Sequence, residues 1–153
     1  MSITDIYNYL AVTDTLVASG QPTEDQLRSV KDAGFAAVVN LATFDSKRSI
    51  PNERDVVDGL SMEYHHIPVR WKKPTEDDLL QFFGVMRSLS GKKVLIHCIA
   101  NYRVMAFLSL YAMADMGWSE SQAIDLINKI WDPNEDPVWR KYLRAMMEKL
   151  IET

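Results

Sequence analysis

The sequence predicts an α/β fold with a mainly parallel sheet flanked by helices. Short apolar segments alternate along the chain with amphipathic segments of about 10–15 residues, and this alternation is typical of strands joined by crossover helices. Two apolar segments, residues 35–41 and 93–98, are unbroken runs, as expected for strands buried on both faces of a sheet. A chain of 153 residues without repeats, linkers or low-complexity tracts fits one domain over residues 1–153.

The first half of the chain predicts four strands and two helices. The strands are expected at residues 10–12, 16–19, 35–41 and 62–69. Thr23 and Gln26 have the spacing of a capping box, so a helix is expected to begin there and to end at Gly34. A short helix is expected over residues 52–58, before Gly59.

The second half predicts one strand and four helices. The helices are expected at residues 76–89, 103–116, 120–131 and 138–151. Ser119 and Gln122 form another capping box before the third of these helices. Pro133 and Pro137 break the chain before the last helix. The strand, residues 93–98, ends on the only cysteine of the chain.

Composition and charge exclude several kinds of partner. The chain is 47% hydrophobic and 25% charged, as in an ordinary folded domain, and its net charge is −4. A negative chain is not expected to bind nucleic acid or an anionic membrane surface through bulk electrostatics. The first residues include acids and no long apolar run, so neither a signal peptide nor a membrane span is predicted. Because Cys98 is the only cysteine, no disulfide can form within the chain, and the cytoplasm is the expected compartment.

The strongest chemical signal is the segment HCIANYR, residues 97–103, between the last strand and the next helix. In open α/β sheets, ligands bind at the carboxyl ends of strands. A loop at a helix N-terminus presents free backbone N–H groups that can hold a tetrahedral anion, and the same positive end favours a thiolate at Cys98. Arg103 can hold two anion oxygens in a bidentate fork. These groups suit in-line attack on phosphorus through a cysteinyl-phosphate.

A lone cysteine at the end of a buried strand is more often a small core residue than a nucleophile. The neighbours of Cys98 favour the nucleophile: His97 precedes it, a tight loop follows, and Arg103 begins the next helix. Asn101 lies within this loop, and asparagine tolerates a left-handed backbone conformation better than most residues.

Four short motifs occur in a characteristic order along the chain. They are SGQP at residues 19–22, VVNL at 38–41, IPV at 67–69 and HCIANYR at 97–103. With them, the sequence resembles the cysteine-dependent protein tyrosine and dual-specificity phosphatase superfamily. It resembles more closely the bacterial phosphatase-like proteins of the DUF442 type. The resemblance covers about residues 19–103 and, less distinctly, the tail.

The resemblance implies a protein tyrosine phosphatase-like fold of the dual-specificity type, with Cys98 as nucleophile and Arg103 as phosphate clamp. Four further residues would bind phosphate through their backbone: Ile99, Ala100, Asn101 and Tyr102. His97 would orient this loop from behind. The expected substrate is a phosphorylated small molecule or a phosphoprotein, bound without a metal or organic cofactor, and the oligomeric state stays open.

Three departures from the superfamily pattern keep other functions open. Four residues separate Cys98 from Arg103, not five, and loops of this length are familiar from rhodanese-like sulfurtransferases, so sulfur transfer through Cys98 is one alternative. The position of the general-acid aspartate corresponds to Trp71, and the hydroxyl residue expected after the arginine is Val104. A pseudophosphatase that binds a phosphorylated ligand without turnover is the other alternative. For a phosphorylated substrate, Trp71 would wall the pocket.

No general acid is assigned from the sequence. Glu76 and Asp77 open a helix, where acids are favoured by the helix dipole. Three further acids lie in the loop between the last two helices: Asp132, Glu135 and Asp136. This loop could fold over the site, or it could simply connect two helices.

A basic cluster and a histidine pair complete the list of candidate features. Arg70, Lys72 and Lys73 surround Trp71 and could either attract a phosphorylated substrate or form a solvated loop. His65 and His66 are adjacent on a strand, so their side chains point to opposite faces and cannot both reach one ion. No metal site is predicted.

Overall fold

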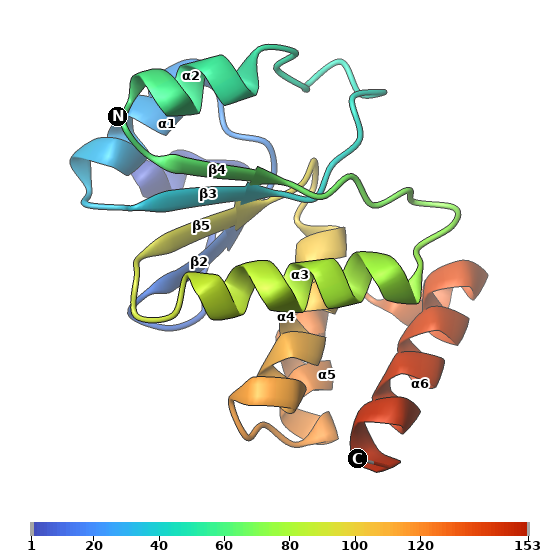
Figure 1. Cartoon of the computed structure of the whole chain (residues 1–153). Helices are drawn as coiled ribbons and strands as arrows, with labels where there is room; N and C mark the ends of the chain where they lie inside the picture. The colour runs from blue at the N-terminus through green and yellow to red at the C-terminus, as the bar shows by residue number, and fades with distance from the viewer. Residues whose placement is uncertain (1, 153) are drawn as a thin grey trace.

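The computed structural model describes residues 2–152 and contains a five-stranded sheet with helices on both faces (Figure 1). The strands lie in the order β1-β2-β5-β3-β4. Their bounds are Leu10–Ala11 (β1), Leu16–Ser19 (β2), Ala37–Asn40 (β3), Glu63–His66 (β4) and Val94–His97 (β5). β1 pairs antiparallel with β2, and the other neighbours pair in parallel. The predicted α/β class with a mainly parallel sheet is therefore confirmed.

The helices divide between the two faces of the sheet. On one face lie η1 (Ile3–Asp5), α1 (Glu24–Asp32) and α2 (Glu53–Gly59). On the other lie α3 (Glu76–Ser88), α4 (Tyr102–Asp115), α5 (Glu120–Asn128) and α6 (Pro137–Glu152), with the short η2 (Pro133–Glu135) between the last two. Figure 1 shows α1 and α2 above the sheet and α3 to α6 below it.

Two apolar cores result, because successive strand residues point to opposite faces. In β5, Leu95 packs in the core between the sheet and α1 and α2, and Ile96 packs in the larger core between the sheet and α3 to α6. Val38 and Val39 of β3 divide in the same way. This division explains why these strands are unbroken apolar runs in the sequence.

The strand register brings three of the sequence motifs to one edge of the sheet. His97, the last residue of β5, pairs with Ser19 of β2 and with Asn40 of β3. Each of these residues ends its strand in the same direction, so the segments that follow all leave the sheet at its carboxyl edge. The loop after β5 therefore has the segments after β2 and β3 as its neighbours.

The predicted elements are present, although several ends differ. The strand expected over 62–69 ends as β4 at His66, because Pro68 has no N–H to donate to a ladder. The N–H groups of Ile67 and Val69 still donate to Asn40 O (2.9 Å) and Leu41 O (3.0 Å), so the chain stays extended beside β3. The helix expected to reach residue 131 ends as α5 at Asn128. Between residues 2 and 152, none of the helices is long and apolar enough to cross a membrane.

Candidate active site

The segment that carries the predicted chemistry connects β5 to α4. Cys98 is the first residue after β5 and is almost fully buried, with 1% of its surface exposed. Its N–H donates to Ser19 O at 3.4 Å, which continues the pairing of β5 with β2 for one more residue. α4 begins at Tyr102, so Cys98 lies one short loop away from the N-terminus of a 14-residue helix.

Six consecutive backbone N–H groups follow Cys98 and find no acceptor within residues 2–152. They belong to Ile99, Ala100, Asn101, Tyr102, Arg103 and Val104. The first N–H groups of any helix have no intrahelical acceptor, and here the loop adds more of them. The positive end of the α4 dipole lies at the same place. This combination suits a tetrahedral anion.

Asn101 shapes the loop and ties it to the N-terminal segment. Its backbone is left-handed (φ 70°, ψ 8°), a conformation that asparagine adopts more readily than most residues. Its Nδ2 donates to Asn8 O at 2.8 Å, and Asn8 Nδ2 donates to Ala100 O at 2.9 Å. Both hydrogen bonds join the loop to Asn8, which lies more than ninety positions earlier in the chain. Asn8 was not singled out from the sequence.

Gly20 explains the motif that follows β2. A Cβ at this position would lie 2.4 Å from Ile99 O and 2.8 Å from Tyr7 Cδ2, so only glycine fits between the loop and the N-terminal segment. The next residue, Gln21, donates its N–H to Ile99 O at 2.9 Å. The SGQP motif therefore supports the loop after Cys98 through direct backbone contact.

Arg103 is buried, with 7% of its surface exposed, and reaches the segment after β4. Its Nη1 donates to Val69 O at 2.9 Å. Within the described residues it forms no ion pair, so its other guanidinium N–H groups are available to an anion. Its charge also contributes to the lowered pKa of Asp45, after the hydrogen bonds from Thr43 and from the Asp45 backbone. Asp45 was not identified from the sequence.

A buried hydrogen-bond network lies behind Cys98. His97 and Glu53 are both fully buried, and His97 Nε2 lies 2.7 Å from Glu53 Oε2. The other ring nitrogen, Nδ1, is 3.0 Å from Cys98 O. Gln21 Nε2 donates to Glu53 Oε1 at 2.7 Å. His97 therefore contacts the backbone of Cys98. Its partner Glu53 was missed because nothing local distinguishes this glutamate in a short helix.

Trp71 lies in an aromatic cluster beside the loop. Its ring centroid is 6.1 Å from Tyr102, 5.4 Å from Trp131 and 5.2 Å from Trp139. Trp131 Nε1 donates to Tyr102 O at 3.0 Å, and Trp139 Nε1 donates to Trp71 O at 2.8 Å. The position expected for a general acid is thus occupied by a ring packed against the first residue of α4. Val104 is fully buried and offers no hydroxyl to the thiol.

Trp71 also lines an open cleft of about 550 Å³. Its lining consists of the loop after β3 and the loop after β4: Thr43, Phe44, Asp45, Arg70, Trp71 and Lys72. The predicted basic cluster therefore borders a cleft with an aromatic wall.

The acids considered from the sequence have structural partners. Glu76 pairs with Lys149 at 2.9 Å on the surface. Asp132 Oδ1 accepts from Asn134 N, and Asp136 Oδ1 accepts from Val138 N, both at 3.0 Å. Asp77 and Glu135 are exposed. None of these contacts directs a carboxyl group at Cys98, and within residues 2–152 no cluster of His, Cys, Asp or Glu suits a metal ion.

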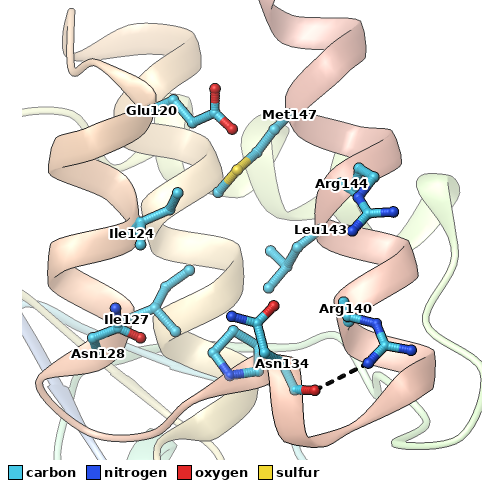
Figure 2. Close-up of a pocket in the computed structure, with 10 residues that line it drawn as sticks. Glu120, Ile124, Ile127, Asn128, Asn134, Arg140, Leu143, Arg144 and Met147 are labelled. Carbon is cyan, nitrogen blue, oxygen red and sulfur yellow. Dashed lines mark hydrogen bonds between the residues drawn. The ribbon is translucent and has the colours of Figure 1, made fainter.

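A second hollow lies far from this loop in the sequence, between α5 and α6 (Figure 2). Its lining includes Ile124, Leu143 and Met147, with Arg140 donating to Asn134 O at 3.2 Å. Its lining shares no residue with the cleft beside Trp71 and includes none of residues 97–103.

The fold and the site together define a class, the cysteine-dependent protein tyrosine and dual-specificity phosphatase fold. Solved structures that share it include the following three. A DUF442 phosphatase-like protein from Shewanella putrefaciens CN-32 is 32% identical, with a TM-score of 0.88 over 97% of this chain and 96% of that chain. Tk-PTP is 23% identical, with a TM-score of 0.78 over 95% and 98%. TpbA from P. aeruginosa, in complex with phosphotyrosine, is 15% identical, with a TM-score of 0.74 over 100% and 94%.

The chain belongs to the DUF442 family of phosphatase-like proteins, since its identity with the Shewanella protein extends over almost the whole of both chains. No protein-family model matches the chain. Two curated proteins from Xylella fastidiosa strains, both named beta-lactamase hydrolase-like protein, are 28% identical over 119 residues. The match covers 76% of this chain but spans only about a quarter, 25%, of the length of those relatives.

Proposed function

We propose that the protein hydrolyses a phosphomonoester, of the phosphotyrosine type or a small aryl phosphate, through a cysteinyl-phosphate on Cys98. The Cys98 thiolate attacks phosphorus, an S–P bond forms, and the ester P–O bond breaks, so that the leaving group departs as an oxyanion and takes its proton from water. Water then attacks the same phosphorus, the S–P bond breaks, and inorganic phosphate leaves while the thiolate is restored. Arg103 and the N–H groups of residues 99–103 hold the equatorial oxygens in both steps.

The observation that carries this proposal is the row of unpaired N–H groups after Cys98, together with the Arg103 guanidinium. Such groups are fixed before substrate arrives, so they stabilise charge on the phosphoryl oxygens without reorganising. Family membership supports the same chemistry, and the relative TpbA binds phosphotyrosine. The phosphorylated substrate is a small molecule or a phosphoprotein, and the aromatic side chains of the cleft, Phe44 and Trp71, favour an aryl group. A reducing compartment such as the cytoplasm would keep the Cys98 thiol available.

The test is release of inorganic phosphate from p-nitrophenyl phosphate and from phosphotyrosine. Cys98→Ser and Arg103→Ala should each abolish release while thermal melting shows a folded protein. Arg87→Ala is the matched control, since Arg87 pairs with Asp115 on the surface. Turnover by purified Cys98→Ser equal to that of the parent would overturn the assignment of the nucleophile.

Sulfur transfer is the second candidate, favoured by the four-residue spacing between Cys98 and Arg103. In that reaction the Cys98 thiolate attacks the outer sulfur of thiosulfate, the S–S bond breaks, and sulfite leaves. Cyanide then takes the sulfur from the Cys98 persulfide as thiocyanate. Thiocyanate formation that depends on Cys98, without phosphate release from any ester, would replace the phosphatase assignment.

Binding without turnover is the third candidate, because Trp71 occupies the position of the missing acid. It predicts that phosphotyrosine binds to the parent protein in calorimetry, with Arg103→Ala losing the binding, while no phosphate is released over hours.

A further inference from the structure

One edge of the sheet carries backbone groups that have no partner. β4 is the last strand in the sheet order, and Figure 1 shows it as the outermost strand, next to α2. The N–H groups of Glu63 and Ile67 donate to carbonyl groups on the β3 side, at 3.0 and 2.9 Å. Alternate residues of a strand bond to the same neighbour, so the N–H and C=O groups of Tyr64 and His66 point away from β3. No strand of residues 2–152 follows there, and these groups are open to a further extended chain.

An open groove of about 580 Å³ runs along this edge. Its floor is β4, and one wall is a single face of α3, formed by Gln81, Gly84, Val85 and Ser88. Arg54 of α2 lines the other side, because α2 and α3 lie on opposite faces of the sheet. The volume lies within the range of about 300–1,000 Å³ that is typical of binding sites.

Gly84 leaves part of this wall empty. It lies within α3, where glycine is less favourable than alanine. A Cβ at this position would meet nothing within 4 Å, so no contact among residues 2–152 requires a glycine here. A residue without a side chain does allow the backbone of another chain to approach closely. The glycine therefore suits a guest in the groove better than it suits the helix.

The charges along the groove favour an acidic guest. Among residues 2–152, Arg54 forms no ion pair, and its guanidinium lies 5.0 Å from the centroid of the Tyr64 ring. The lining contains no Asp or Glu. The acid of β4, Glu63, is already paired with Lys92 at 3.0 Å and with His65 at 3.2 Å. A second copy paired through the same edge would bring two such surfaces together with no free acid for either Arg54, so a different partner that carries carboxylates is favoured.

We propose that this groove binds an extended segment of a partner protein, which adds a strand to β4 and carries alternating acidic and aliphatic residues. Successive side chains of such a strand point to opposite faces. One set faces α2, where a carboxylate can pair with Arg54, and the other faces α3, where an aliphatic side chain fills the space beside Gly84 and Val85. Backbone hydrogen bonds to Tyr64 and His66 supply affinity, and the side chains supply specificity. This inference goes beyond the proposed function and requires no turnover.

The groove ends next to the candidate active site. The ring centroid of His66, the last residue of β4, is 4.9 Å from that of Phe44. Phe44 lines the cleft beside Trp71, so the groove and the cleft meet at this pair of rings. A protein held on β4 would thus be recruited beside the cleft, without occupying the loop after Cys98.

Binding of a synthetic peptide tests the proposal. The probe is Val-Glu-Val-Glu-Val with blocked ends and a fluorescent label, and we expect saturable binding to the parent protein in fluorescence anisotropy. Arg54→Gln should weaken this binding about tenfold, and Gly84→Leu, which fills the groove, by at least about tenfold. The matched controls are Arg144→Gln on α6 and Gly59→Leu at the end of α2, which lie outside the groove and should keep the parent affinity. A Cβ at Gly59 also meets nothing within 4 Å.

Amide hydrogen exchange measured by NMR tests the mode of binding. Exchange at Tyr64 and His66 should slow when the peptide is bound, since both N–H groups gain acceptors. The absence of saturable binding, parent affinity in Arg54→Gln and Gly84→Leu, or unchanged exchange at these two amides would each overturn the proposal. Sedimentation of the parent protein as a dimer that Gly84→Leu dissociates would assign the groove to a second copy and would overturn it as well. A protein that binds the peptide as expected but releases no phosphate would retain this inference and lose the proposed function.

Discussion

Gly20→Ala gives the sharpest test of the loop geometry. The added methyl group would lie 2.4 Å from Ile99 O, 2.8 Å from Tyr7 Cδ2 and 3.0 Å from Tyr7 O. Such contacts essentially never fall below 3.0 Å, so the backbone of Ile99 must retreat from Gly20 by about 0.6 Å, the difference between 3.0 and 2.4 Å. Both oxygens belong to the backbone, so a rotamer change can relieve only the contact with Tyr7 Cδ2.

The displaced carbonyl belongs to the residue directly after Cys98, so the N–H groups of the loop move with it. A misplacement approaching 1 Å in an active site costs about 10²-fold in rate, and overpacking costs about 1–3 kcal/mol of stability. We therefore expect Gly20→Ala to lower kcat on p-nitrophenyl phosphate by roughly 10- to 100-fold. Its free energy of unfolding in urea should fall by about 1–3 kcal/mol.

Gly84→Ala provides the matched control. Gly84 lies within α3, and a Cβ there would meet nothing within 4 Å. Alanine in a helix interior is favoured over glycine by roughly 0.5–1 kcal/mol, so this variant should be slightly more stable and fully active. If Gly20→Ala matched the parent in both kcat and stability, the close contact between Gly20 and the loop would be wrong.

Four further predictions concern charge and the leaving group. Arg103→Lys keeps the charge but loses the bidentate fork, so kcat/KM should fall by at least about tenfold, with Arg87→Lys unchanged. Because Trp71 occupies the acid position, p-nitrophenyl phosphate should react faster than phosphoserine by a factor on the order of 10²–10⁴, and equal rates would point to a proton donor elsewhere. Glu53→Ala leaves His97 buried and unpaired, so urea denaturation should show a loss of about 3–5 kcal/mol at pH 7, and a loss near zero would contradict the ion pair. The pKa of Glu53 is lower in the folded state than in the unfolded state. The carboxylate therefore stabilises the fold fully above the unfolded-state pKa of about 4.3, and this stabilisation disappears as the pH falls through the folded-state pKa. The free energy of unfolding of Glu53→Gln should accordingly depend less on pH in that acidic range, as urea denaturation at several pH values would show.

Local signals in the sequence were sufficient to predict the fold class and most of its helices and strands. Thr23, Thr75 and Ser119 each form a capping box at the start of a helix. The hydroxyl of the cap residue accepts from the backbone N–H three residues on, and the side chain of that residue accepts from the backbone N–H of the cap residue. The unbroken apolar runs became β3 and β5 in the middle of the sheet. Strand ends were less predictable, since a segment such as residues 67–69 keeps hydrogen bonds to its neighbour without forming a regular ladder.

The loop could be anticipated for a similar reason, because its main residues are contiguous. The residues that support it are not. Asn8 reaches Ala100 over 92 positions, and Glu53 reaches His97 over 44. A polar residue in a turn and a glutamate in the first turn of a short helix are ordinary surface features, and only the folded chain shows that Glu53 is fully buried. Contacts of this kind follow from strand order, which single-sequence patterns do not specify.

Trp71 shows how a departure noticed in the sequence acquires a physical role in the structure. By position it marks an absent proton donor. In the fold, its carbonyl accepts from Trp139 of α6, and its ring packs against Tyr102, whose carbonyl accepts from Trp131. An aspartate could not make these ring contacts. The segment after β4 is thereby fixed against the start of α4, where the unpaired N–H groups lie. We infer that catalysis in this chain depends on placing the phosphoryl group and stabilising its charge, and that it is confined to leaving groups that depart without protonation.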